Sequence, residues 1–223
     1  RASVDINGIH SAQLINAKLD KGLRCLFGPE HGFAGTALAG AEVKDGWHPE
    51  WQIPIHSLYG NTRKPTREML EGLDMIVVDL QDISVRCYTY VSTLRLVLEA
   101  AARHGLDVVV ADRPVPFPNV ADGPMLDPAV ESFVGMIPAP LVYGMTPAET
   151  ALFLKKQVVP EVSLFVIPMS GWRRDAGWPV IAPWNPPSPG IRTWETAMIY
   201  PSLVCCEADR KSTRLNSSHV SQS

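Results

Sequence analysis

The segment LFGPEHGF, residues 26 to 33, places a glutamate and a histidine between residues that favour turns. Gly28 and Pro29 predict that the chain leaves an apolar strand abruptly and presents Glu30 and His31 on a constrained loop. Loops held by a rigid sheet commonly carry binding and catalytic groups. The segment alone is at least as typical of a solvated turn, so its chemistry depends on its surroundings.

Charged side chains also follow two further apolar runs. If these runs are parallel strands, their carboxyl ends meet at one edge of the sheet, where ligands bind in such folds. We therefore expect the side chains of three strand ends to gather at one edge. The candidates are Glu30, His31, Asp79, Gln81, Asp82, Arg86, Tyr88, Tyr90, Asp112 and Arg113.

The wider pattern predicts an α/β domain. Several apolar runs are separated by segments with helical periodicity, and Thr146 with Glu149 fits a capping box at a helix start. Strands without clean alternation, separated by helices, indicate a mostly parallel sheet covered on both faces. We predict a Rossmann-like, doubly wound fold. Strands are expected at 23–27, 75–80, 107–111, 140–143 and 163–167, and helices at 9–19, 90–104 and 146–157.

The sequence changes character after residue 168. Residues 169–208 are rich in proline and tryptophan, which predicts an irregular segment that packs or contacts a ligand. We expect residues 1–168 to form one lobe and 169–208 to begin a smaller C-terminal lobe. Residues 209–223 match one reading frame of a common sequencing adapter, so we treat them as a non-native tail. The chain begins at Arg1 without a signal segment, and we expect the natural start to lie upstream.

Composition and motifs disfavour several classes of protein. A formal net charge of -3 lacks the basic excess of nucleic-acid-binding proteins. No apolar run approaches the roughly 18 to 20 residues that span a bilayer. GPEHGFAG lacks the G-x-G-x-x-G spacing, so a nucleotide enzyme is a disfavoured alternative. The histidines and acids show no metal-ligand spacing, and we predict neither metal nor other cofactor. Cys25 and Cys87 are expected as buried thiols.

Glycoside hydrolysis suits the acidic residues better. It requires a carboxylic acid beside the leaving oxygen, often a second carboxylate, and a cleft that shields them. Glu30 is a candidate for the acid, and Tyr88, Tyr90 and Trp184 are candidates for aromatic surfaces that contact a sugar. The alternative is that the Glu30 carboxylate only structures its own loop.

Seven motifs together resemble the NamZ-type exo-β-N-acetylmuramidases of bacteria. In chain order they are LFGPEHGFAG, IPIHSLYGNTRKPT, VVDLQDISVRCYTYVSTL, ADRPVP, DGPMLD, YGMTPAE and PPSPGIRTWETAMIYPSLV. The resemblance runs from about residue 4 to Glu207. It implies release of N-acetylmuramic acid from the non-reducing end of peptidoglycan fragments, and a Rossmann-like lobe whose cleft a smaller C-terminal lobe closes.

The resemblance also assigns roles to residues. Glu30 matches the proposed catalytic glutamate of the family, with His31 beside it to orient the acid or to cap the turn. Glu207 matches the acid of an E-G-T-N stretch, after which this chain departs from the family pattern. The D-x-Q-D-x-x-x-R-x-Y-T-Y and D-R-P patterns assign the other candidates to the substrate site, namely Asp79, Gln81, Asp82, Arg86, Tyr88, Tyr90, Asp112 and Arg113.

These candidates keep structural alternatives. Arg86 could pair with Asp82, and one of Tyr88 and Tyr90 could face the site while the other packs. Muramic acid carries a lactyl carboxylate that N-acetylglucosamine lacks, and an arginine binds such a group through two parallel hydrogen bonds. Our hypothesis at this stage is that Arg86 or Arg113 selects for it.

Two expectations follow for the protein as a whole. The expected partner is a peptidoglycan-derived muramyl saccharide, and work on a cell-wall polymer favours a periplasmic or secreted location. The rival to the enzyme is a non-catalytic module that binds cell-wall fragments in the same cleft. That module would bind saccharides saturably without turnover and would tolerate Glu30→Gln.

Overall fold

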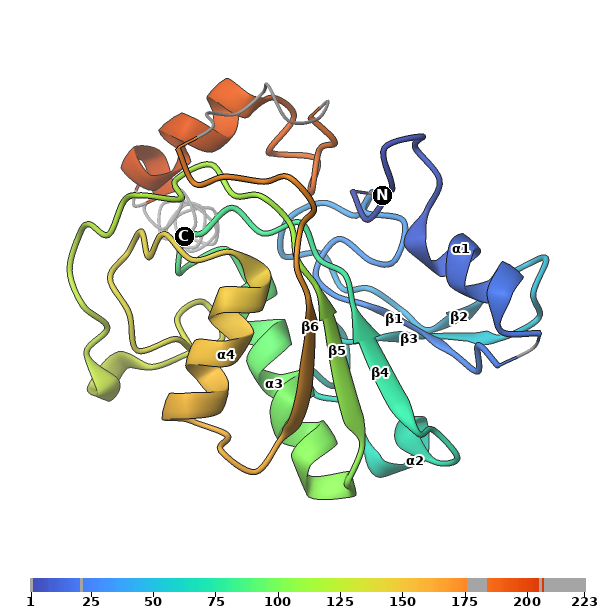
Figure 1. Ribbon diagram of the computed structural model, residues 1–223. Helices are drawn as coiled ribbons and strands as arrows, with labels where there is room; N and C mark the ends of the chain where they lie inside the picture. The colour runs from blue at the N-terminus through green and yellow to red at the C-terminus, as the bar shows by residue number, and fades with distance from the viewer. Residues whose placement is uncertain (1, 21, 176–183, 205, 207–223) are drawn as a thin grey trace, which may run out of the picture.

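Two three-stranded sheets form the framework of the computed structural model, which describes residues 2–20, 22–175, 184–204 and 206 (Figure 1). In the first sheet β1 pairs in parallel with β3, and β2 pairs antiparallel with β3. In the second sheet β4, β5 and β6 pair in parallel in that order. The strands are β1 (Leu26–Gly28), β2 (Gly46–Trp47), β3 (Pro54–Ser57), β4 (Met75–Val78), β5 (Asp107–Ala111) and β6 (Ser163–Ile167).

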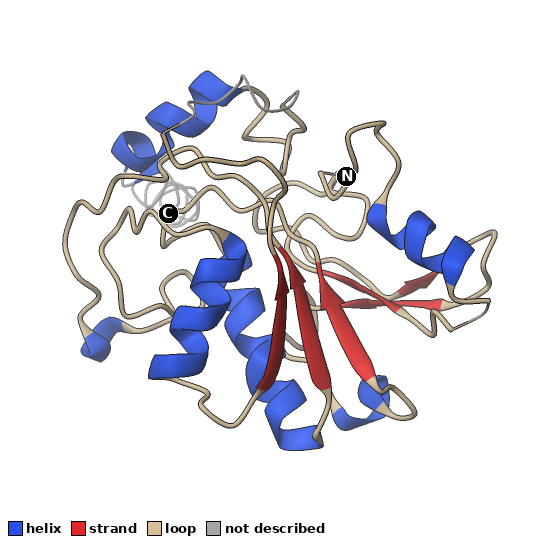
Figure 2. Ribbon diagram, in the orientation of Figure 1, coloured by secondary structure: helices blue, strands red, loops and turns tan. Residues whose placement is uncertain are grey.

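Helices α3 and α4 pack on one face of the second sheet (Figure 2). The main core lies between them and the strands. There the alternate side chains Val108 and Val110 of β5 are fully buried against Leu98 of α3 and Leu154 of α4. The helices are α1 (Ser11–Lys18), α2 (Arg67–Leu70), α3 (Tyr90–His104) and α4 (Pro147–Gln157), with a 3-10 turn at Pro128–Val130 and a further helix over 194–204.

Local sequence signals explain how the two long helices begin and end. Thr146 and Glu149 form the expected capping box at the start of α4, with Pro147 at its first position. Gly105 ends α3 in the left-handed region, with φ of +67°, where glycine avoids the strain of a side chain. The predictions of these two helices are confirmed, and α1 is found within the expected 9–19.

The strand predictions are confirmed in part. β5 and β6 have the expected bounds, β1 and β4 are shorter or shifted, and the two strands of the first sheet at 46–47 and 54–57 were not predicted. The prediction of a strand at 140–143 is wrong. Pro138 and Pro140 lack the N–H groups that a ladder needs, and Val142 makes only isolated bridges to Val85 and Asp122.

The α/β, Rossmann-like class with a mostly parallel sheet is confirmed, but the cover of the second sheet is uneven. On the face away from α3 and α4, Met75 and Val77 of β4 and Phe165 and Ile167 of β6 are between 43% and 55% exposed. Within the described residues, helices therefore cover one face of this sheet well and the other only weakly.

Residues 184–204 pack over the carboxyl ends of the second sheet, where the strand arrows end in Figure 2. Ile191 and Ala197 join a second buried cluster with Ile83, Tyr88 and Tyr90. For the described residues of the Pro- and Trp-rich segment, this packing fits the interpretation that the segment packs against the domain. The lobe boundary at residue 168 stays a prediction, and the adapter-like tail lies outside the described residues.

Gly28 allows a close backbone approach at the end of β1. A Cβ atom there would lie 2.7 Å from the backbone nitrogen of Phe33, whereas one at Gly46 in β2 would meet nothing within 4 Å. We expect Gly28→Ala to lower the free energy of unfolding by about 1–3 kcal/mol. Chemical denaturation should find Gly46→Ala within about 0.5 kcal/mol of the parent. Equal effects of the two changes would contradict this account.

Candidate active site

The Glu30 side chain lies in the turn that follows β1 and is only 8% exposed. Its Oε1 accepts a hydrogen bond from the backbone N–H of Gly40 at 2.9 Å, and its Oε2 accepts one from the Thr89 hydroxyl at 2.6 Å. Thr89 is the N-cap of α3. The carboxylate is thus fixed by two neutral donors, one from its own loop and one from the start of a long helix.

His31 has an unusual backbone conformation. Its φ of +72° lies in the left-handed region, which non-glycine residues occupy rarely and at an energetic cost. The His31 carbonyl accepts hydrogen bonds from the N–H groups of Thr36 and Ala37. The ring Nδ1 lies 2.8 Å from the Ala37 carbonyl oxygen, which only accepts, so Nδ1 carries the proton. These contacts hold the turn that orients Glu30.

Asp79 and Arg113 come together at the carboxyl ends of β4 and β5, as the sequence predicts. The Arg113 Nε and Nη2 donate to the two carboxylate oxygens of Asp79 at 2.5 and 2.7 Å. The remaining Nη1 donates to the Val4 carbonyl, and the Asp79 carbonyl accepts from Ser3. This pair therefore ties the N-terminal segment to the sheet, and its charges neutralise each other.

Asp82 is fully buried and has no basic partner among the described residues. Its carboxylate accepts hydrogen bonds from the Tyr143 hydroxyl and from the backbone N–H of Ile83. Burial raises the pKa of Asp82 from an ordinary value of 3.8 to about 6, and the hydrogen bonds from Tyr143, Ile83 and Ser84 oppose part of that rise. The Arg86–Asp82 pair that the sequence allowed does not form in the part of the chain that the structure describes.

Gln81 and Arg86 donate to backbone carbonyls. Gln81 Nε2 binds the carbonyls of Asp82 and Pro114 at 3.1 and 2.8 Å. Arg86 Nη1 binds those of Pro124 and Ala139 at 2.8 and 2.6 Å. Both side chains thereby connect the loop after β4 with distant loops.

Asp112 holds the start of α4. It accepts hydrogen bonds from the Thr146 hydroxyl at 3.1 Å and from the Ala148 N–H at 2.9 Å. Burial raises the pKa of its carboxyl, and these two donors and the Arg113 N–H counter that effect. These contacts give Asp112 a structural role, and its contact with substrate stays a prediction.

Tyr88 and Tyr90 both turn inward, contrary to the expectation that one of them faces a sugar. Each is 6% exposed, and their rings meet edge to face with centroids 4.9 Å apart. The Tyr90 hydroxyl donates to the Pro187 carbonyl at 2.8 Å. Burial raises the pKa of Tyr90 well above its usual value, so it remains a donor at any physiological pH. The two rings anchor residues 186–192 over the start of α3.

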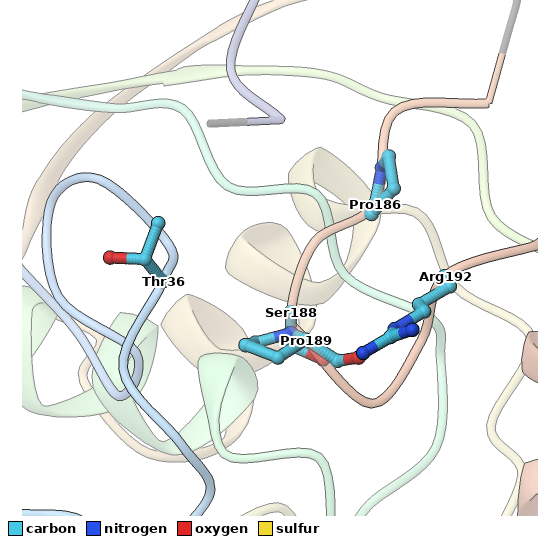
Figure 3. A pocket seen from close by; sticks show the side chains of 5 residues that line it. All are labelled: Thr36, Pro186, Ser188, Pro189 and Arg192. Atoms are coloured by element: carbon cyan, nitrogen blue, oxygen red, sulfur yellow. The ribbon is translucent and has the colours of Figure 1, made fainter.

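Two cavities border the loop that carries Glu30 and share Thr36 in their walls. The first, of about 430 Å³, lies between Thr36 and the segment 186–192 (Figure 3). The second, of about 280 Å³, is lined in part by His31, Lys44 and Trp47. The first is within the size range of small-molecule sites, and the second is slightly below it. Glu30 itself lines neither of these two cavities, but His31 and Thr36 of the same loop do.

Some residues of this region were not found from the sequence as site residues. Thr89 stood within the recognised Y-T-Y pattern, yet nothing in the pattern pairs it with Glu30, 59 positions away. Gly40 contributes only a backbone N–H, which leaves no sequence signal. Arg192 and Ser188 lie in a Pro-rich motif whose cavity is visible only in the fold. Glu207 lies outside the described residues.

Comparison with known proteins decides the family. The family model described as exo-beta-N-acetylmuramidase NamZ, N-terminal, matches residues 1–195. The chain belongs to this family. Over 208 residues it is 39% identical to the peptidoglycan beta-N-acetylmuramidase NamZ of Bacillus subtilis strain 168, a match that covers 92% of this chain and 50% of the relative.

Solved structures support the same fold. A DUF1343 family protein of Bacteroides fragilis superposes with a TM-score of 0.82 at 35% identity, covering 91% of this chain and 52% of the other. A second one gives a TM-score of 0.74 at 28% identity, covering 90% and 53%. The chain therefore spans about half the length of the relatives it matches. No helix in the described residues has the length and apolar character to cross a membrane.

The raised pKa of Asp82 predicts how stability changes with pH. Between pH 4 and pH 6 the unfolded carboxyl loses its proton while the folded one retains it, so the free energy of unfolding falls as pH rises. Relative to Asp82→Asn, the parent should lose about 2 kcal/mol over this range and less than about 0.5 kcal/mol more above it. Denaturant titrations of both proteins at pH 4, 5, 6 and 7 measure the difference. A constant difference across the series would contradict the burial argument.

Proposed function

We propose that this chain contributes the catalytic lobe of an exo-acting β-N-acetylmuramidase, with Glu30 as its general acid and base. Family membership supports the substrate class, since the Bacillus subtilis relative is described as a peptidoglycan beta-N-acetylmuramidase. The observation that carries the catalytic assignment is the Glu30 carboxylate, fixed by Thr89 and Gly40 on the loop that borders both cavities. The proposed substrate is a muramyl saccharide, and a periplasmic or secreted location goes with it.

The other acids at the strand ends have partners or surroundings that make them less suited to act as the general acid. The Asp79 carboxylate is bound by the Arg113 guanidinium, and Asp112 holds the start of α4. Asp82 is sealed inside the core. A general acid must come within hydrogen-bond reach of the oxygen that it protonates. Glu30 lies on the loop whose residues His31 and Thr36 line the two cavities, and no cation pairs with it among the described residues.

The start of α3 supplies the positioning. Thr89 fixes one carboxylate oxygen of Glu30, and the next residue, Tyr90, binds Pro187, whose two chain neighbours line the first cavity. Consecutive residues of one helix thus set the distance between the proposed acid and the opposite wall. Such preorganisation contributes to rate because it removes the need to order these groups during the reaction.

Replacing Glu30 tests the function directly. We expect Glu30→Gln to lower turnover of a chromogenic β-N-acetylmuraminide by about 10²- to 10⁴-fold, because an amide cannot supply the proton. The assay uses this chain alone and joined to the C-terminal half of the Bacillus subtilis relative. The exposed Glu161→Gln serves as the matched control and should retain activity.

The same assay separates the enzyme from the binding module. Saturable binding of muramyl saccharides by folded proteins without turnover, unchanged in Glu30→Gln, would favour the module. Undiminished turnover in Glu30→Gln would move the acid to another carboxylate.

Thr89→Val tests the positioning role. Loss of a hydrogen bond to a carboxylate costs about 1.5–3 kcal/mol, so kcat should fall by roughly 10- to 100-fold with little change in KM. Thr93→Val is the matched control, because the Thr93 hydroxyl lies one turn further along α3 and has no hydrogen-bond partner in the described structure. Equal kcat in the two variants would remove Thr89 from the mechanism.

A further inference from the structure

The first cavity is bounded by segments distant in sequence. Thr36 lies on the loop that carries Glu30, and Pro186, Ser188, Pro189 and Arg192 form the opposite wall (Figure 3). Its volume of about 430 Å³ is within the usual range of small-molecule sites. Arg192 is the charged residue of this wall, so the cavity is suited to a ligand that carries negative charge.

The contacts of Arg192 leave much of its guanidinium open to a ligand. Its Nε donates to the Pro189 carbonyl at 3.0 Å, which folds the side chain back along the cavity wall. Within the described ranges, no carboxylate lies at ion-pair distance from it. The terminal nitrogens are therefore available, and an arginine presents two parallel donors that match a carboxylate.

The other arginines considered for this role are committed elsewhere. Arg113 uses its donors on Asp79 and Val4, and Arg86 binds the carbonyls of Pro124 and Ala139. Neither residue lines the first cavity. Lys44 lines the second cavity and is the rival cation there.

We propose that Arg192 binds the lactyl carboxylate of N-acetylmuramic acid in the first cavity and is the residue that selects muramyl over glucosaminyl saccharides. The inference rests on the proposed function, since it assigns the substrate of that site. The lactyl ether is the group by which N-acetylmuramic acid differs from N-acetylglucosamine. An anion-binding arginine placed across the cavity from the Glu30 loop distinguishes the two sugars by that difference.

The segment that carries Arg192 is held by contacts with the start of α3 and with the second buried cluster. The Tyr90 hydroxyl binds the Pro187 carbonyl, Ser188 is buried, and Ile191 packs into the cluster that contains Tyr88. The backbone on either side of the arginine is thus fixed, although the side chain itself is exposed. A fixed backbone that carries an exposed guanidinium suits the recognition of a soluble sugar with a negative charge.

The test compares two sugars that differ in the lactyl group. Free N-acetylmuramic acid and N-acetylglucosamine are titrated into this chain, with the arginine Nε–Hε resonances and the backbone amides followed by NMR. We expect N-acetylmuramic acid to shift the Arg192 resonance and to bind about tenfold more tightly than N-acetylglucosamine. Arg192→Gln should abolish that preference, and Arg192→Lys should keep only part of it because a lysine lacks the planar fork.

Matched variants make the result specific. Arg67→Gln, an exposed arginine on α2 near the opposite end of the sheet, should keep the preference (Figure 1). A preference that survives Arg192→Gln, or is lost in Lys44→Gln instead, would overturn the proposal. Absence of binding by the folded parent would also overturn it, because the proposal places the carboxylate site within this chain. Turnover in the Glu30 variants judges the proposed function separately from these binding ratios.

Discussion

The hydrogen bond between Thr89 and Glu30 is the contact on which the arrangement of the site depends. It joins the loop after β1 to the first turn of α3, and it is buried, so water does not compete for it. In such surroundings a hydrogen bond to a carboxylate is stronger, and its loss more costly, than at the surface. The edge contact between the His31 and Tyr90 rings adds weaker packing between the same loop and α3.

The start of α3 also organises the opposite wall. Tyr90 reaches Pro187, and Tyr88 packs against Tyr90 and Tyr200, so residues 184–204 rest on the same helix end that fixes Glu30. The buried rings of Tyr88 and Tyr90 thus support the segment that lines the cavity and do not line it themselves. Their burial explains why they contribute rigidity where an exposed ring would contribute a contact surface.

The sequence predicted the elements that follow from local rules and missed contacts that depend on tertiary structure. The capping box at Thr146 and the glycine stop at Gly105 act within a few residues, so α3 and α4 were placed well. The approach of Asp79 and Arg113 to one edge followed from the parallel pairing of β4 and β5, whereas Glu30 follows β1, which lies in the other sheet. The sequence could not reveal that Arg113 binds Asp79 or that Thr89 binds Glu30. Partners distant in sequence meet only in the folded chain. The short β3 begins with proline and lacked a pattern to find it.

A crystal structure with a non-hydrolysable muramyl thioglycoside tests the central claim most directly. The account predicts the Glu30 carboxyl group in direct contact with the bridging sulfur, or one water away, with Thr89 still bound to its other oxygen. A complex in which another carboxylate stands at the bridging atom, while Glu30 stays enclosed in its loop, would contradict it.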